Sequence, residues 1–266
     1  MKTIQLTLLF FIVITSFVSC SIEEPSPDNP LNQTILTKLK NAGYSDKNVR
    51  TISKNTFLIE GDIEMTSNQI DSLPTTQAAR ISQYRTPYLV SPTYLNGKRR
   101  NLTIKVSPDL PAIYTQATDE MIRRFNHVDF ALTFSRVNIG MAAITILKKE
   151  SLPSDTYATS GYPYSYGASY QYIKVRTKTF GSSTDINAIA SILAHEVGHA
   201  IGLRHSDMYE RCGTNIAENI NGASLIRNTP TLDAFSFMYS CSSLIDTPFS
   251  YFDKVTLRSM YPKLGD

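Results

Sequence analysis

The sequence predicts an α+β protein, in which a mixed sheet backed by two long helices follows a small α+β unit. Two observations support this fold class. Beyond residue 83, strand-like segments interleave with two long helical patterns. Before Pro74, a helix, a strand pair and a second short helix form a separate group, and residues 75–86 have the composition of a linker. A chain of 266 residues has room for one good-sized domain plus such an extra segment.

The first 20 residues have the pattern of a signal peptide. Lys2 supplies a short basic start, and residues 4–18 are apolar apart from four polar positions. This run is shorter than the ~20 apolar residues that span a bilayer, and a polar, Pro-rich stretch follows it. We therefore expect export, with residues 21–30 as a disordered tether. A transmembrane anchor is the alternative.

The end of the signal, Phe17-Val18-Ser19-Cys20, resembles the cleavage box of bacterial lipoproteins, in which the Cys becomes the lipidated first residue of the mature chain. That pattern prefers Leu where this chain has Phe17. The resemblance implies that Cys20 carries a lipid which anchors the protein to the bacterial cell envelope, at the outer membrane or the cell surface. Without lipidation, the protein would be secreted.

Two further cysteines, Cys212 and Cys241, remain once Cys20 is assigned to the lipid. Disulfides persist in exported proteins, because those compartments are oxidising. We therefore expect Cys212 and Cys241 to form a disulfide bond. Two buried free thiols are the alternative.

The small N-terminal unit spans residues 31–82. Apolar residues at helical spacing predict a helix over 31–42, which Gly43 would end. Residues 49–65 predict a strand pair with a turn near Lys54-Asn55, and residues 68–73 predict a short helix.

Residues 83–266 form the larger predicted domain. Four segments predict strands and two predict long helices: 102–106, 130–137, 142–147 and 172–177 for strands, and 112–125 and 187–203 for helices. The net charge is +3, and no block of Lys or Arg is present. The composition therefore gives no electrostatic argument for a nucleic-acid partner.

The last of these helices carries a metal-binding pattern. His195 and His199 stand at positions i and i+4, so both imidazoles project from one face and can reach the same ion. Gly202 would let the chain leave the helix sharply and bring His205 back as a third ligand. Glu196 lies beside the ligands, where it can act on a metal-bound water. By chance, the complete pattern would occur in roughly one in 10^5 chains of this length.

The segment from His195 to His205 is similar to the zinc signature of the metzincin metallopeptidases, and residues 236–239 resemble their Met-containing turn. The closer likeness is to the bacterial dual-action HEIGH metallopeptidases, although Val197 stands where that family usually has Ile. The resemblance covers roughly residues 100–240. It implies a metzincin-like zincin catalytic domain over residues 83–266, with Met238 as a structural floor beneath the metal.

This resemblance also implies the chemistry. His195, His199 and His205 would bind one catalytic Zn²⁺, and Glu196 would be the general base of an endopeptidase that cleaves protein or peptide substrates. Ser240 replaces the Tyr that astacins and serralysins use as an extra ligand, so no Tyr ligand is expected. Substrate would pair with an edge strand of the sheet, and residues 158–163 resemble that region.

Two other function classes stay open from the sequence. One is a zinc-stabilised binding or adhesion lipoprotein without turnover, although pure metal binding has no use for Glu196. The other is a zinc amidase that acts on cell-wall peptides. The sequence leaves substrate preference, Ca²⁺ sites and oligomeric state open.

Asp62 is a candidate for a latency ligand. Residues 60–63, Glu-Gly-Asp-Ile, resemble the pro-segment motif of astacins, in which an Asp carboxylate takes the fourth zinc position. Residues 21–82 contain no Cys that could act as a thiol switch. The alternative is an ordinary turn that leaves Asp62 in solvent and a unit with no inhibitory role.

Overall fold

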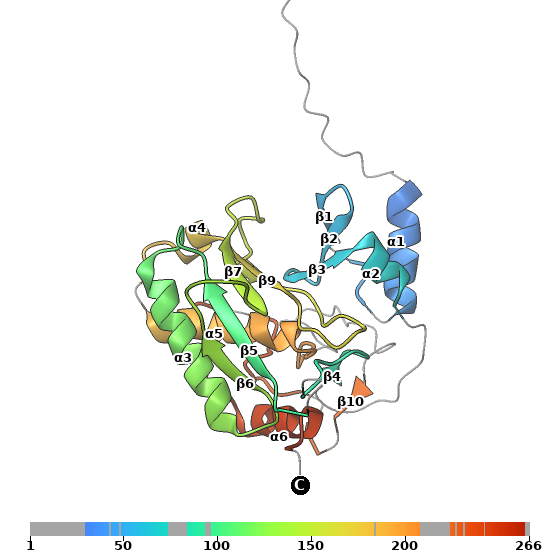
Figure 1. Ribbon diagram of the computed structural model, residues 1–266. Coiled ribbons are helices and arrows are strands. Elements are labelled where there is room, and N and C mark those ends of the chain that lie inside the picture. Colours follow the sequence, from blue (N-terminus) through green and yellow to red (C-terminus); the bar gives the residue numbers. More distant parts are fainter. Residues whose placement is uncertain are drawn as a thin grey trace, which may run out of the picture.

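A five-stranded sheet forms the framework of the larger domain, in the order β6-β5-β7-β9-β8 (Figure 1). Four neighbouring strands are parallel: β5 (Asn101–Val106), β6 (Thr133–Arg136), β7 (Ile144–Lys148) and β9 (Tyr172–Val175). The short edge strand β8 (Ala158–Thr159) runs antiparallel to β9. The computed structural model describes residues 30–263 except 43, 48, 74–83, 94–96, 184, 208–223, 227, 231 and 242.

Two long helices cover one face of this sheet. Helix α3 (Ala112–Val128) packs on β5 and β6, helix α5 (Ile186–Ala200) packs on β8 and β9, and the two helices pack against each other. Every residue of α5 from Ala188 to Ala200 is buried, so this helix lies in the centre of the domain. Its N-terminus is capped by Asp185, whose carboxylate accepts hydrogen bonds from the backbone of Asn187 and Ala188.

Shorter elements surround this framework. Helix α4 (Thr177–Phe180) follows β9, and strand β4 (Tyr84–Arg85) pairs with β10 (Ser224–Leu225). Helix α6 (Tyr251–Met260) packs against α3 and begins with a capping box made by Ser250 and Asp253. Within the described residues, no helix combines the length and the apolar character needed to cross a membrane.

The N-terminal unit has its own sheet and its own hydrophobic cluster. Strands β1 (Arg50–Ser53), β2 (Thr56–Ile59) and β3 (Ile63–Thr66) form an antiparallel sheet in chain order, flanked by α1 (Pro30–Asn41) and α2 (Ser67–Asp71). The cluster also contains Tyr162 of the larger domain, so the unit packs directly on that domain. Figure 1 shows the unit on the side of the large sheet where β9 lies.

The predicted α+β class, with a mixed sheet and two long helices, is confirmed. Several details differ. Residues 49–65 contain three strands rather than two, because the chain reverses at Lys54-Asn55 and again at residues 60–62. The strand predicted over 130–137 begins only at Thr133, since the backbone N–H of Ala131 bonds to Tyr261 beyond α6. Helix α6 was not predicted.

The predicted boundary between the two units, at residues 82 and 83, lies outside the described residues, as do the signal peptide and residues 21–29 of the tether. These assignments stay predictions.

Phe125 on α3 is a test of the main core. Its ring is fully buried and contacts Phe134, Phe237 and Phe249 at centroid distances of 4.9, 5.9 and 4.8 Å. Phe125→Ala should lower the free energy of unfolding by about 3–5 kcal/mol, because it leaves a large cavity. Urea unfolding would measure the change. Phe235→Ala, at a side chain that is 81% exposed, is the control and should change stability by less than about 0.5 kcal/mol. Equal effects of the two substitutions would contradict this description of the core.

Candidate metal centre

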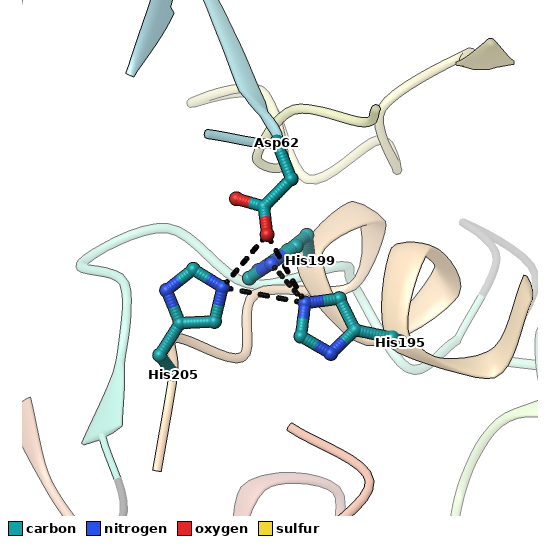
Figure 2. A group of neighbouring side chains, drawn as sticks. All are labelled: Asp62, His195, His199 and His205. Carbon is teal, nitrogen blue, oxygen red and sulfur yellow. Dashed lines mark hydrogen bonds and ion pairs between the residues drawn. The ribbon is translucent and has the colours of Figure 1, made fainter. Parts of the chain in front are cut away.

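Three histidines converge at the C-terminal end of helix α5. His195 and His199 lie one turn apart on the helix, and His205 returns from the segment that follows it (Figure 2). All three are at most 4% exposed. The structure therefore brings together the three histidines that the sequence singles out.

The spacing of their Nε2 atoms fits a tetrahedral metal ion. His195 Nε2 lies 3.1 Å from His199 Nε2 and 3.3 Å from His205 Nε2. A tetrahedral ion with ligands at about 2.0–2.1 Å separates its ligand atoms by about 3.3–3.4 Å. Three buried acceptor nitrogens that face one another cannot satisfy each other by hydrogen bonding, whereas a shared cation satisfies all of them.

Backbone carbonyl groups fix the orientation of two of these rings. His195 Nδ1 donates to the carbonyl of Phe237 at 2.8 Å, and His199 Nδ1 donates to the carbonyl of Leu203 at 2.9 Å. A carbonyl oxygen only accepts, so the proton is on Nδ1 and the lone pair of Nε2 faces the centre. Burial, together with the neighbouring His195 and His205, holds the pKa of His199 well below its usual value. His199 is therefore neutral, which is the form that binds metal.

Gly202 creates the turn that returns His205 to the site. Its φ is +108°, a conformation that strains other residues, and a Cβ there would lie 2.8 Å from Leu89 Cδ2. The chain next to Gly202 pairs with the segment around β4, because Thr86 N donates to Gly202 O and Arg204 N donates to Tyr84 O. The helix predicted to reach residue 203 ends at Ala200 for this reason.

Met238 lies beneath the helix, where the sequence predicts a structural floor. It is 2% exposed, and its backbone carbonyl accepts from Ser206 N, the residue after His205. A Cβ at Gly198 would lie 2.3 Å from Met238 Sδ, so only glycine lets the sulfur approach the helix this closely. Asp253 holds the turn by accepting hydrogen bonds from Ser236 Oγ and Phe237 N.

The fourth member of the group is Asp62, from the N-terminal unit. Asp62 Oδ2 lies 3.1 Å from His205 Nε2 and 3.5 Å from His195 Nε2 (Figure 2). The ligand atoms of Asp62 and the three histidines all lie within 4.8 Å of one another. Burial raises the pKa of Asp62, but the adjacent His205 and His195 lower it by more. The pKa of Asp62 is therefore well below its usual value.

A tight hairpin turn delivers Asp62 to the histidines. Ile59 of β2 and Ile63 of β3 are partners, which leaves residues 60–62 as a three-residue loop. Both Glu60 and Gly61 have positive φ, +54° and +89°. A positive φ is uncommon for a non-glycine residue, and contacts with the larger domain hold Glu60 in it.

These contacts make Glu60 a site residue that sequence reasoning missed. Its side chain is fully buried, Oε1 lies 3.4 Å from Arg204 Nη2, and Oε2 lies 3.8 Å from His205 Nδ1. Arg204 also stacks over the ring of Tyr44, 4.3 Å from its centroid. No local pattern could indicate Glu60, because its partner is 144 residues away in the sequence.

Glu196 lies beside the metal group. It is 2% exposed, and its Oε2 has no hydrogen-bond partner among the described residues. Burial, and then the carboxylate of Asp62, raises the pKa of Glu196 well above its usual value. Glu196 and Asp62 line the same cleft, together with Thr156, Ala158 and His195. A second hollow next to the Met238 turn also reaches His195 and is lined by Ile192, Phe237, Tyr239 and Ile245 among others.

The remaining predicted residues fall in different parts of the chain. Ser240 binds Asp207 through its backbone N–H and its hydroxyl, at 2.9 and 2.6 Å. Cys20 and Cys212 lie outside the described residues, so the lipid on Cys20 and the pairing of Cys212 with Cys241 stay predictions.

Comparisons with known proteins identify the family of the chain. No curated protein matches the chain. Among solved structures, myroilysin is 16% identical, with a TM-score of 0.42 over 66% of this chain and 92% of its own. High choriolytic enzyme 1, a hatching enzyme zinc-protease from the medaka fish Oryzias latipes, is 16% identical, with a TM-score of 0.44 over 66% of this chain and 96% of its own. A family model described as "Dual-action HEIGH metallo-peptidase" matches residues 57–261, which include every member of the metal group. The chain therefore belongs to the dual-action HEIGH metallo-peptidase family and is a zinc metallopeptidase.

Proposed function

We propose that this protein is an exported zinc endopeptidase whose N-terminal unit keeps it latent. The observation that carries this proposal is the group of Asp62 with His195, His199 and His205, next to the buried Glu196. The histidines would hold one Zn²⁺, and Asp62 would occupy its fourth position. A catalytic zinc site needs that position open, so a protein ligand there means an inactive state.

A bound Zn²⁺ would supply Lewis acidity, which polarises the scissile carbonyl and acidifies a water at neutral pH. The residues of the chain supply the proton transfers. Glu196 accepts the proton of the attacking water at its carboxylate and passes it to the leaving amine. Its raised pKa suits both roles, because a base that must later donate works best with a pKa close to the working pH. Two peptides leave, and no covalent enzyme intermediate is required.

The substrate would add as a strand to the edge of the large sheet. Strand β8 is one of the two edge strands, and its Ala158 lines the cleft that contains Glu196. Ser160, which follows β8, donates its backbone N–H to Asp62 O at 2.9 Å and accepts from Glu64 N at 2.6 Å. The N-terminal unit thus occupies the edge that an extended peptide would use. Latency follows from two effects, the blocked metal position and the occupied edge.

Removal of the Glu196 carboxylate tests the mechanism. In a chain that also carries Asp62→Ala, Glu196→Ala should lower kcat/KM for a fluorogenic peptide by about 10²–10⁴-fold, because general base catalysis is lost. Zinc content by atomic absorption should stay near one per chain, since Glu196 is not a ligand. A variant that keeps a tenth of the parent activity would rule out this mechanism, whereas an inactive variant that has also lost zinc would show that Glu196 acts structurally.

Removal of the Asp62 carboxylate tests latency. Asp62→Ala in the full-length chain, and a truncated chain that begins near Gln83, should each cleave peptide much faster than full-length wild-type protein. The control is Asp71→Ala, which removes another carboxylate of the same unit, one that forms an exposed ion pair with Lys38. That variant should stay as latent as the wild type. Equal rates in all four proteins would contradict the proposed latency.

Lipidation of Cys20 tests the proposed anchor, which rests on the signal-like N-terminus and its lipoprotein-like cleavage box. Cells grown with a labelled fatty acid should incorporate the label into the wild-type protein, and the protein should be found in the membrane fraction. Cys20→Ala should remove the label and release the protein from that fraction. Cys241→Ala is the control and should keep the label. A wild-type protein that is exported without label would be a secreted enzyme.

A further inference from the structure

The N-terminal unit inserts a second carboxylate into the larger domain, and its partners form a cradle. Glu64 on β3 is 1% exposed. Its carboxylate accepts a hydrogen bond from Thr159 Oγ1 at 2.7 Å and forms an ion pair with Lys174 Nζ. Tyr170 lies close to it, and the pKa of Tyr170 is raised by burial and then by the charge of Glu64. A buried carboxylate is costly unless such partners compensate it.

All three partners belong to the larger domain and stay there when the N-terminal unit leaves. Thr159 on β8 and Lys174 on β9 are directly paired across the sheet, so their side chains share one face. Among the described residues, Glu64 is the one carboxylate within ion-pair distance of Lys174. The Lys174 side chain is already 25% exposed, so loss of Glu64 would expose it further and remove this anionic partner.

The cradle lies close to the metal group, because Glu64 and Asp62 are only two residues apart in the sequence. Asp62 is the last residue of the hairpin loop and Glu64 is the second residue of β3, so their Cα atoms are at most about 7 Å apart. The backbone can approach closely because residue 161 is glycine: a Cβ there would lie 2.8 Å from Glu64 O. A peptide that occupies the same edge therefore presents a side chain to the cradle within a few residues of its scissile bond.

We infer that the cradle of Thr159, Tyr170 and Lys174 is a substrate subsite for an acidic side chain, and that Glu64 fills this subsite in the latent state. The inference rests on the proposed peptidase function and names its substrate class: peptides with Glu or Asp close to the cleaved bond. Lys174 supplies the charge that selects the carboxylate, and Thr159 supplies a directed hydrogen bond. The residue that helps to hold the N-terminal unit in the cleft thereby imitates the substrate.

The test compares matched substrates. Full-length protein carrying Asp62→Ala is profiled with a random peptide library, and a cleaved peptide is then remade with Glu or Gln at each of the six positions nearest the cleaved bond. At one position, kcat/KM for Glu should exceed that for Gln roughly tenfold, the effect of one hydrogen-bonded charge. This ratio does not depend on the fraction of folded enzyme, so a purely structural defect leaves it unchanged.

Substitutions of Lys174 test whether this residue causes the difference in kcat/KM between the Glu and Gln peptides. Lys174→Met should bring the ratio close to one, and Lys174→Glu should make the enzyme prefer Lys to Gln at the same position. Lys148→Met, at an exposed lysine on the neighbouring strand β7, is the control and should keep the ratio of the parent. A ratio near one at all six positions, or a ratio that survives Lys174→Met, would overturn the inference.

Failure of the proposed function would look different, because no protein would cleave any peptide. In that case, the affinity of the protein for a Glu-containing peptide tests the cradle without any cleavage. Labelled peptides of residues 58–68, with Glu or Gln at position 64, are titrated with full-length protein carrying Asp62→Ala and Glu64→Gln, and fluorescence anisotropy gives each Kd. The Glu peptide should bind roughly tenfold more tightly. Equal Kd values for the two peptides would overturn the inference.

Discussion

Three imidazole nitrogens that converge on one point, with His195 Nε2 at 3.1 and 3.3 Å from the other two, impose the main constraint on this protein. Such an arrangement is stable only around a shared cation, and neighbouring elements are shaped to maintain it. Gly198 lets Met238 support the helix from below, and Gly202 lets the chain turn back within three residues to place His205. The carbonyl groups of Phe237 and Leu203 hold the protons of two rings away from the centre. A substitution at any of these places acts on the site without contacting the metal.

The N-terminal unit places three carboxylates against the larger domain at this site, those of Glu60, Asp62 and Glu64. They stand at alternate positions of one hairpin and contact basic groups of the larger domain: Glu60 contacts Arg204 and His205, Asp62 the histidines, and Glu64 Lys174. The partners are buried or partly buried, so their interactions are screened less than those of surface ion pairs. The unit therefore depends on electrostatic complementarity at the cleft as well as on the apolar contact around Tyr162.

Sequence patterns were sufficient where the interacting residues are close in the chain. The helical spacing of His195 and His199, the following Gly202 and the return of His205 are local features, and the structure brings these histidines together. The two long helices and the parallel strands also follow from local periodicity. Asp62 could be proposed only through a resemblance, because its contact with His205 joins residues 143 positions apart.

The parts that the sequence did not predict depend on tertiary placement. Glu60 and Glu64 have no local pattern that distinguishes them from solvent-exposed turn and strand residues, and Lys174 alternates along β9 like any surface lysine. Strand β8 is only two residues long, too short for a periodic signal. Helix α6 has a clear capping box at Ser250 and Asp253, which could have indicated its start.

The pairing of the hairpin with the end of β8 also has a consequence for solubility. An unpaired sheet edge exposes backbone N–H and C=O groups that can template aggregation with other chains. In the latent state, the bridge between Ile63 and Ser160 covers the chain beside this edge. Loss of the N-terminal unit would uncover it at the moment when activity begins. With the export and latency proposed above, that edge would be exposed only outside the cell interior, away from nascent chains of the same protein.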